Sequence, residues 1–146
     1  MIPEFKKLTE EERELLYQAP ALVSVLASCG TNAINETRKK DAIKLSHLKT
    51  FTANPALIPY YQEVESGFAE RFEALARKYY PFDEEKRAEL REEVNRVSEV
   101  IAKLDNKFFA QTLYTSLKRY ADHIKRSTHS VFQDFMFPMP IPGLSA

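Results

Sequence analysis

The residues whose types best suit chemistry in this sequence are an aspartate and two histidines near its C-terminal end. Asp122, His123 and His129 lie close together in the sequence, and carboxylates and imidazoles are ligands of zinc. A di-iron centre in a helical bundle would need Glu-x-x-His motifs. The residues three positions before the three histidines are instead Lys44, Tyr120 and Arg126. We interpret Asp122, His123 and His129 as solvated side chains on a basic helix. A metal-binding or small-molecule-binding stress protein is the alternative, which elemental analysis of the purified protein would test.

Nucleophilic catalysis is a second chemistry that the residue types allow. A reactive cysteine or serine needs a base held beside it. The single cysteine, Cys29, ends an apolar run, where we expect a small buried thiol with a raised pKa rather than a reactive thiolate. The sequence has no glycine-rich phosphate loop of either known spacing. We predict that the protein is not an enzyme and that it has no catalytic residue, no cofactor and no bound metal.

Two basic segments raise nucleic-acid binding as a third possibility. In residues 36–50, five cationic side chains outnumber two acidic ones, for a net charge of +3: Arg38, Lys39, Lys40, Lys44 and Lys49 against Glu36 and Asp41. The second segment carries Lys107, Lys118, Arg119, Lys125 and Arg126. If the two segments were adjacent, they would form a positive stripe in which the rings of Tyr114 and Tyr120 lie between the cations. We favour solvated helix faces balanced by acidic helices elsewhere, and therefore expect nucleic acid not to be the main partner.

The overall composition restricts the class of protein. A chain of 146 residues suits one domain with a sizeable core. Its 21 basic and 21 acidic side chains give a formal net charge of zero, so no global field attracts nucleic acid or an anionic membrane. A single cysteine fits a reducing cytoplasm. We expect a cytoplasmic protein with neither a signal peptide nor a membrane-spanning segment.

One apolar stretch predicts the central helix, against which the helices that carry these residues would pack. The run LLYQAPALVSVLASC, residues 15–29, is apolar nearly all the way round, and such a helix must be buried on every side. A capping box formed by Thr9 and Glu12 predicts where this helix begins. Pro20 predicts a kink within it, and Gly30 predicts its end. Because apolar residues elsewhere repeat at three and four positions, we predict an all-α fold, a compact bundle of about five helices around this central one.

The remaining helices are predicted from their caps and apolar stripes. A connector at residues 51–58 contains a helical turn opened by Asn54-Pro55. Ser127 and Thr128 interrupt the last apolar stripe, so the pattern allows either one long helix or two helices with a break there. The predicted helices are residues 36–50 capped by Asn35, 59–79 ended by Pro81, 84–104 capped by Asp83, and a fifth that begins near Asn106 and is capped by Asp105.

Apolar residues crowd the C-terminal end of the chain. They are Val131, Phe132, Phe135, Met136, Phe137, Met139, Ile141 and Leu144. Prolines at 138, 140 and 142 exclude a helix there and favour extended chain. An apolar patch of this kind, left in water, marks an interaction site or an aggregation hazard. We divide the chain into a helical domain, residues 1–137, and a tail, residues 138–146, which packs on its own bundle or contacts a second copy or a protein partner.

The stretch LLYQAPALVSVLASCGTNAINETRKKDAI resembles the opening of TerB-like domains, the helical family associated with tellurite resistance. In that family a buried apolar helix ends in Ala-x-Ala-Asp-Gly, and an isoleucine and a helix starting near a glutamate follow. The residues that match in kind are Ala27, Cys29-Gly30, Ile34 and Asn35-Glu36. The segment LDNKFFAQTLYTSLKRYADHIKRS resembles the distal helices of the family, so the resemblance spans residues 9–126. It implies a compact bacterial cytoplasmic domain, associated with stress or metal resistance, that often binds partners, sometimes near membranes.

The resemblance also implies a divalent-cation site, which we predict to be degenerate here. Family members are proposed to bind the cation through acidic residues at the helix junctions, but Thr31 and Arg38 stand at those positions. Asn32, Asn35 and Glu36 still supply oxygens, yet one carboxylate is too few for useful calcium affinity. We expect calorimetry at physiological pH to detect no stoichiometric binding of calcium or magnesium. A sub-micromolar site at this turn would contradict the prediction.

Overall fold

The computed structural model describes residues 2–29 and 33–126, and within these ranges the fold is all-α, as the sequence predicts. The five helices are α1 (Glu10–Ser28), α2 (Glu36–Thr52), α3 (Ile58–Tyr79), α4 (Glu84–Ala102) and α5 (Lys107–Lys125). Two short 3-10 turns are also present, η1 (Pro3–Phe5) and η2 (Pro55–Leu57). The expectations for Gly30, for the interruption at Ser127 and Thr128, and for the tail at 138–146 lie outside the described residues.

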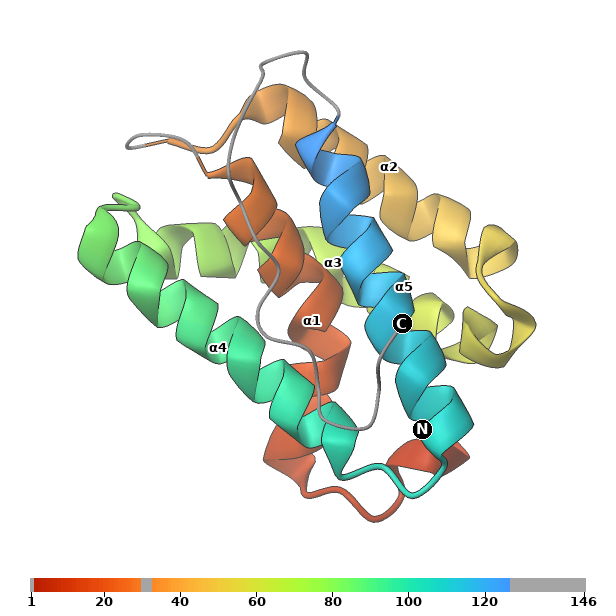
Figure 1. Ribbon diagram of the computed structural model, residues 1–146. Coiled ribbons are helices and arrows are strands. Elements are labelled where there is room, and N and C mark those ends of the chain that lie inside the picture. Colours follow the sequence, from red (N-terminus) through yellow and green to blue (C-terminus); the bar gives the residue numbers. More distant parts are fainter. Residues whose placement is uncertain (1, 30–32, 127–146) are drawn as a thin grey trace.

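Helix α1 is the centre of the bundle (Figure 1). In this view α4 and α5 flank it and α3 passes behind it, and α1 packs against each of the other four helices. Every residue of α1 from Ala19 to Ser28 is buried. The predicted capping box begins the helix: the Thr9 hydroxyl accepts from the Glu12 amide at 3.1 Å, and the Glu12 carboxylate accepts from the Thr9 amide at 2.9 Å. The central helix is therefore confirmed, and it is fully buried from Ala19 to Ser28.

Pro20 lies inside α1, which continues unbroken through it. Proline has no amide hydrogen, so the carbonyl four residues earlier, that of Leu16, loses its helical donor. The Tyr60 hydroxyl of α3 replaces that donor and lies 2.6 Å from the Leu16 oxygen. Both residues are fully buried, so no water substitutes for this bond. Tyr60 therefore compensates for the proline that the sequence places in the central helix.

The cap of α5 differs from the prediction by one residue. Asn106, not Asp105, is the N-cap, and its side-chain oxygen accepts from the Phe109 amide at 3.0 Å. A capping side chain reaches only the amide two or three residues ahead, so the start of α5 at Lys107 selects Asn106. The Asp105 carboxylate instead pairs with Lys7 at 2.7 Å. The predicted caps at Asn35 and Asp83 and the Asn54 turn are confirmed.

The η1 turn is an element that the sequence does not predict. Its Phe5 side chain is 0 % exposed and meets three other rings edge-on. The centroid distances are 5.3 Å to Tyr17, 5.9 Å to Tyr60 and 6.1 Å to Phe109. Edge-to-face aromatic pairs stabilise a core beyond their buried area. The N-terminal segment thus closes one end of the bundle. Within the described ranges, no helix is both long enough and apolar enough to cross a membrane.

The bond between Tyr60 and Leu16 gives a test of the architecture. Replacing Tyr60 with phenylalanine should lower the free energy of unfolding by about 1–3 kcal/mol, because a buried carbonyl loses its donor. In a Pro20→Ala background the same replacement should cost less, since alanine restores the helical amide. Urea denaturation of the four proteins measures this coupling.

The matched control for this test is Tyr61→Phe. The Tyr61 hydroxyl bonds to that of Ser116 at 2.6 Å, so its removal should cost the same whether or not Pro20 is present. An equal cost of Tyr60→Phe in the two backgrounds would show that the tyrosine does not compensate for the proline.

Candidate functional site

Helix α2 carries most of the candidate residues, and pairs of polar side chains connect both its edges to its neighbours. His47 of α2 lies 2.5 Å from the Glu65 carboxylate of α3, and Lys39 pairs with Glu73 of the same helix. On the other edge, His123 of α5 lies 3.0 Å from the Asp41 carboxylate. These pairs fix the position of α2 against α3 and α5.

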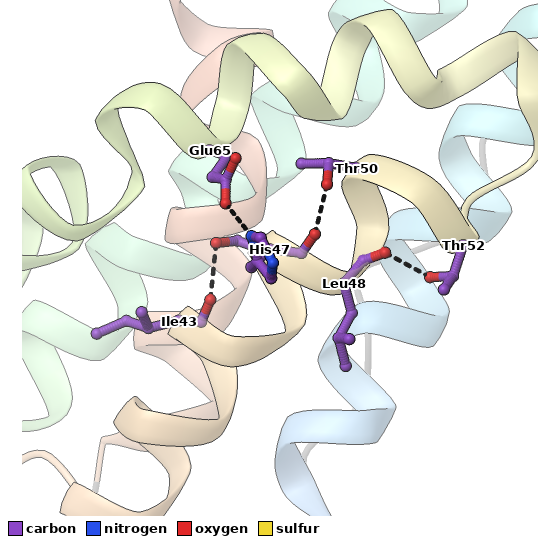
Figure 2. A network of polar contacts seen from close by, with 7 residues as sticks. Ile43, His47, Leu48, Thr50, Thr52 and Glu65 are labelled. Carbon is purple, nitrogen blue, oxygen red and sulfur yellow. Dashed lines mark hydrogen bonds and ion pairs between the residues drawn. The ribbon is translucent and has the colours of Figure 1, made fainter.

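Figure 2 shows how the C-terminal half of α2 is held. The His47 ring points to Glu65, while the hydroxyl of Thr50 donates to the His47 carbonyl at 2.6 Å and that of Thr52 donates to the Leu48 carbonyl at 2.8 Å. Each hydroxyl adds a second hydrogen bond to a carbonyl in the last turns of the helix. These bonds lie in the last two turns of α2, which ends at Thr52.

Arg38 makes the most unusual polar contacts in the structure. Its guanidinium donates to the Ala27 carbonyl, in the last turn of α1, and to the Lys125 carbonyl, in the last turn of α5, both at 2.9 Å. The residue is only 5 % exposed. The last carbonyls of a helix lack helical donors and form the negative end of its dipole. One buried cation thus satisfies the C-terminal ends of two helices, and burial lowers its pKa somewhat.

The position of Arg38 in its own helix is the signal that could have revealed this role. Arg38 follows the Asn35 cap within the first turn of α2, where a cation opposes the dipole of its own helix. The sequence counts Arg38 among the basic residues of a surface, and this expectation is wrong because the side chain turns into the core. A guanidinium already occupies the junction where the TerB resemblance implies a cation. Thr31 and Asn32, the other residues of that implied site, lie outside the described residues.

The structure gives separate partners to two of the three residues first considered as metal ligands. His123 pairs with Asp41 rather than with Asp122, and Asp122 lies 3.9 Å from Lys125. His129 lies outside the described ranges. Among the residues that are described, no group of three or more histidine, cysteine or acidic side chains is placed to hold a metal ion.

Cys29 has the environment that the sequence predicts, although its side chain is half-buried rather than fully buried. Its thiol lies 3.4 Å from the Leu26 carbonyl. Burial raises the pKa of the thiol, and the charges of Arg87, Arg91 and Arg38 offset only part of this rise. A thiol with a raised pKa is a poor nucleophile near neutral pH.

Two surface cavities bring charged side chains together. One, of about 310 Å³, lies between the N-terminal segment and the α4–α5 turn and is lined by residues that include Lys6, Lys7, Lys103 and Asp105. The other, of about 300 Å³, is lined by Glu10, Arg13, Glu14, Tyr17 and Glu63. Ion pairs already engage part of both linings, since Lys7 pairs with Asp105, Lys103 with Glu12 and Arg71 with Glu14.

The two basic helices, α2 and α5, do pack side by side, as the nucleic-acid hypothesis requires. The aromatic part of that hypothesis is wrong, because Tyr114 and Tyr120 are buried. The Tyr120 hydroxyl donates to the Ala42 carbonyl at 2.9 Å inside the core. Tyrosine rings in the interior offer no stacking surface to bases.

Several cations of α2 and α5 keep no acidic partner after folding. Within the part of the chain that the structure describes, no carboxylate lies within 4.0 Å of the charged groups of Lys40, Lys44, Lys49, Lys118 and Arg119.

The role of Arg38 can be tested by mutation. Arg38→Met should lower the free energy of unfolding by roughly 2–4 kcal/mol, because two buried helix-end carbonyls lose a charged donor. Arg38→Lys should cost less, since an ammonium group reaches one of the two carbonyls. Lys40→Met, an exposed cation on the same helix, is the matched control and should change stability by less than about 0.5 kcal/mol. Equal effects of Arg38→Met and Lys40→Met in urea denaturation would refute the bridging role.

The geometry is the basis for assigning a function, because comparisons of the chain with protein-family models, curated proteins and solved structures find no match.

Proposed function

We propose that this protein is a non-enzymatic helical module that works by binding other protein surfaces. One observation carries the proposal: the polar side chains best suited to chemistry hold the helices together. His47 and His123 pair with carboxylates on neighbouring helices. The three fully buried tyrosines, Tyr60, Tyr61 and Tyr120, bond to backbone carbonyls or to a serine. A catalytic residue, in contrast, must keep a reactive atom free to reach its substrate.

The proposal includes a cytoplasmic role of the TerB-like kind, in a bacterial stress or tellurite-resistance response. The short matches around Ala27, Ile34 and Asn35-Glu36 support the family, and the single cysteine supports a reducing compartment. In this proposal the cation site of the family is degenerate, and Arg38 supplies positive charge at the same junction. The contact with a partner or a second copy is made by the tail, residues 138–146, whose apolar composition supports an interaction site.

Deleting residues 138–146 tests the tail. If the tail contacts a second copy, the deletion should reduce the molar mass measured by light scattering. If it packs on its own bundle, the deletion should lower the melting temperature and increase binding of a hydrophobic dye. A full-length variant with Met139, Ile141 and Leu144 replaced by serine should reproduce either change, because it removes apolar side chains but keeps the prolines and the length. Unchanged mass together with an unchanged melting temperature would refute both roles.

A further inference from the structure

Charge is divided unevenly between two opposite sides of the bundle, although the whole chain is neutral. Helix α2 has five cationic residues and two acidic ones, for a net charge of +3. Helix α4 has four cationic residues and six acidic ones, for a net charge of −2. In Figure 1 these two helices lie on opposite sides of α1, which packs against both. Their opposite charges therefore do not meet within one molecule.

The exposed side of α2 combines cations with apolar side chains. Its members recur every three or four residues, so they share one side of the helix, and all of them are exposed. Within the described ranges, no carboxylate lies within 4.0 Å of the ammonium groups of Lys40 and Lys44. Ile43 stands between these two lysines, and Phe51, which is 61 % exposed, stands about two turns further along. We call this set the α2 face: Lys40, Ile43, Lys44, His47 and Phe51.

The outer side of α4 has a complementary pattern. Its members also recur every three or four residues and are partly or fully exposed. Among the described residues, no cationic nitrogen lies within 4.0 Å of the carboxylates of Glu85, Glu92 and Glu99. Along the helix, Ala88 stands between Glu85 and Glu92, as Ile43 stands between two lysines on α2. We call this set the α4 face: Glu85, Ala88, Glu92, Asn95 and Glu99.

An exposed aromatic ring lies at one end of each face. Phe51 is in the last turn of α2, and Tyr80, which is 62 % exposed, lies just before the start of α4. If the two faces met with their helices antiparallel and Ile43 on Ala88, the C-terminal end of α2 would lie over the N-terminal end of α4. The two rings would then come to the same end of the contact, where aromatic pairs add stability beyond their buried area. Antiparallel packing also opposes the two helix dipoles.

We propose that the α2 face binds the α4 face of a second copy of this chain, with the two helices antiparallel. In this contact Lys44 pairs with Glu85, and Lys40 pairs with Glu92. The apolar contact of Ile43 lies between these ion pairs, and the aromatic contact lies beyond them. A second copy is the partner because the chain itself carries the matching charges, on a side of the bundle that α1 separates from α2.

The position of the two faces determines the kind of assembly. Because they lie on opposite sides of α1, each copy offers one face to one neighbour and the other face to the next, which is a head-to-tail arrangement. Exposed ion pairs contribute little individually and are screened by salt, so we expect a weak association that salt reverses. This contact is additional to the tail contact proposed above and does not depend on it.

Analytical ultracentrifugation of the full chain tests the contact. At low salt the average mass should rise with protein concentration, and it should fall as salt is added. Lys40→Gln with Lys44→Gln removes the cations of the α2 face, and Glu85→Gln with Glu92→Gln removes carboxylates of the α4 face. Each double variant should self-associate roughly tenfold more weakly, since two ion pairs are lost. Mixed together, the two variants should form a 1:1 dimer that does not extend, because each keeps only one of the two faces.

The matched controls are Lys6→Gln with Arg77→Gln, and Glu63→Gln with Glu70→Gln. They make the same changes in charge at exposed positions outside both faces, so each should self-associate like the wild type. Equal weakening in the controls would reduce the effect to net charge and overturn the proposal. A wild type that stays monomeric at low salt, or a mixture of the two face variants that forms no dimer, would also overturn it. All variants change exposed side chains, so unchanged melting temperatures should show that they remain folded.

The orientation of the helices has a separate test in the two exposed rings. Phe51→Ser and Tyr80→Ser should each weaken self-association severalfold, and the double variant should lose less than the two losses combined, because the rings contact each other. Phe108→Ser is the matched control, since this ring on α5 is 68 % exposed and lies outside both faces, and it should have no effect. Fully independent effects of Phe51→Ser and Tyr80→Ser would contradict the antiparallel contact. A tail contact, being apolar, should persist at high salt, so it can fail or succeed independently of this contact.

Discussion

A helix enclosed on all sides cannot use water to satisfy its backbone, and this constraint determines how the bundle is assembled. Helix α1 has carbonyls without a helical amide donor at two places. One is Leu16, which Pro20 leaves without a donor, and the other is its last turn. Tyr60 of α3 supplies the first donor and Arg38 of α2 supplies the second. Arg38 also reaches the end of α5. The unpaired carbonyls of the central helix therefore help to position α3 and α2, and Arg38 connects α5 to the same end, in addition to the apolar packing.

The local features of this fold could be predicted from sequence because their causes are local. Thr9, Asn35 and Asp83 cap helices through amides only three residues away. The apolar run of α1 indicates its burial directly. The hydrogen bonds to the remaining carbonyls of α1 could not be predicted in the same way, because their donors, Tyr60 and Arg38, lie on other helices. Nothing in the neighbourhood of Tyr60 shows that its hydroxyl meets the gap left by Pro20, 40 residues earlier.

The surface cations could likewise be predicted only in part from the sequence. The sequence identifies α2 and α5 as basic, but it does not show which cations remain without partners. In the folded protein, Arg38 is buried and Lys39 pairs with Glu73. It also buries the two tyrosines that would have indicated nucleic acid. What remains in the described part of the chain is a smaller set of cations without a carboxylate within 4.0 Å, namely Lys40, Lys44, Lys49, Lys118 and Arg119.

The contacts of Arg38 have a consequence for the order of events during protein synthesis. The ribosome releases the chain from its N-terminus, so Ala27 and Arg38 emerge well before Lys125, which lies 87 positions after Arg38. In a nascent chain α2 can pack against α1 early, but one nitrogen of the Arg38 guanidinium then lacks the Lys125 carbonyl to which it donates. Until α5 is made, the half-built bundle keeps a cation in need of an acceptor. The protein itself can therefore supply an acceptor for this second donor of Arg38 only after the last turn of α5 has formed.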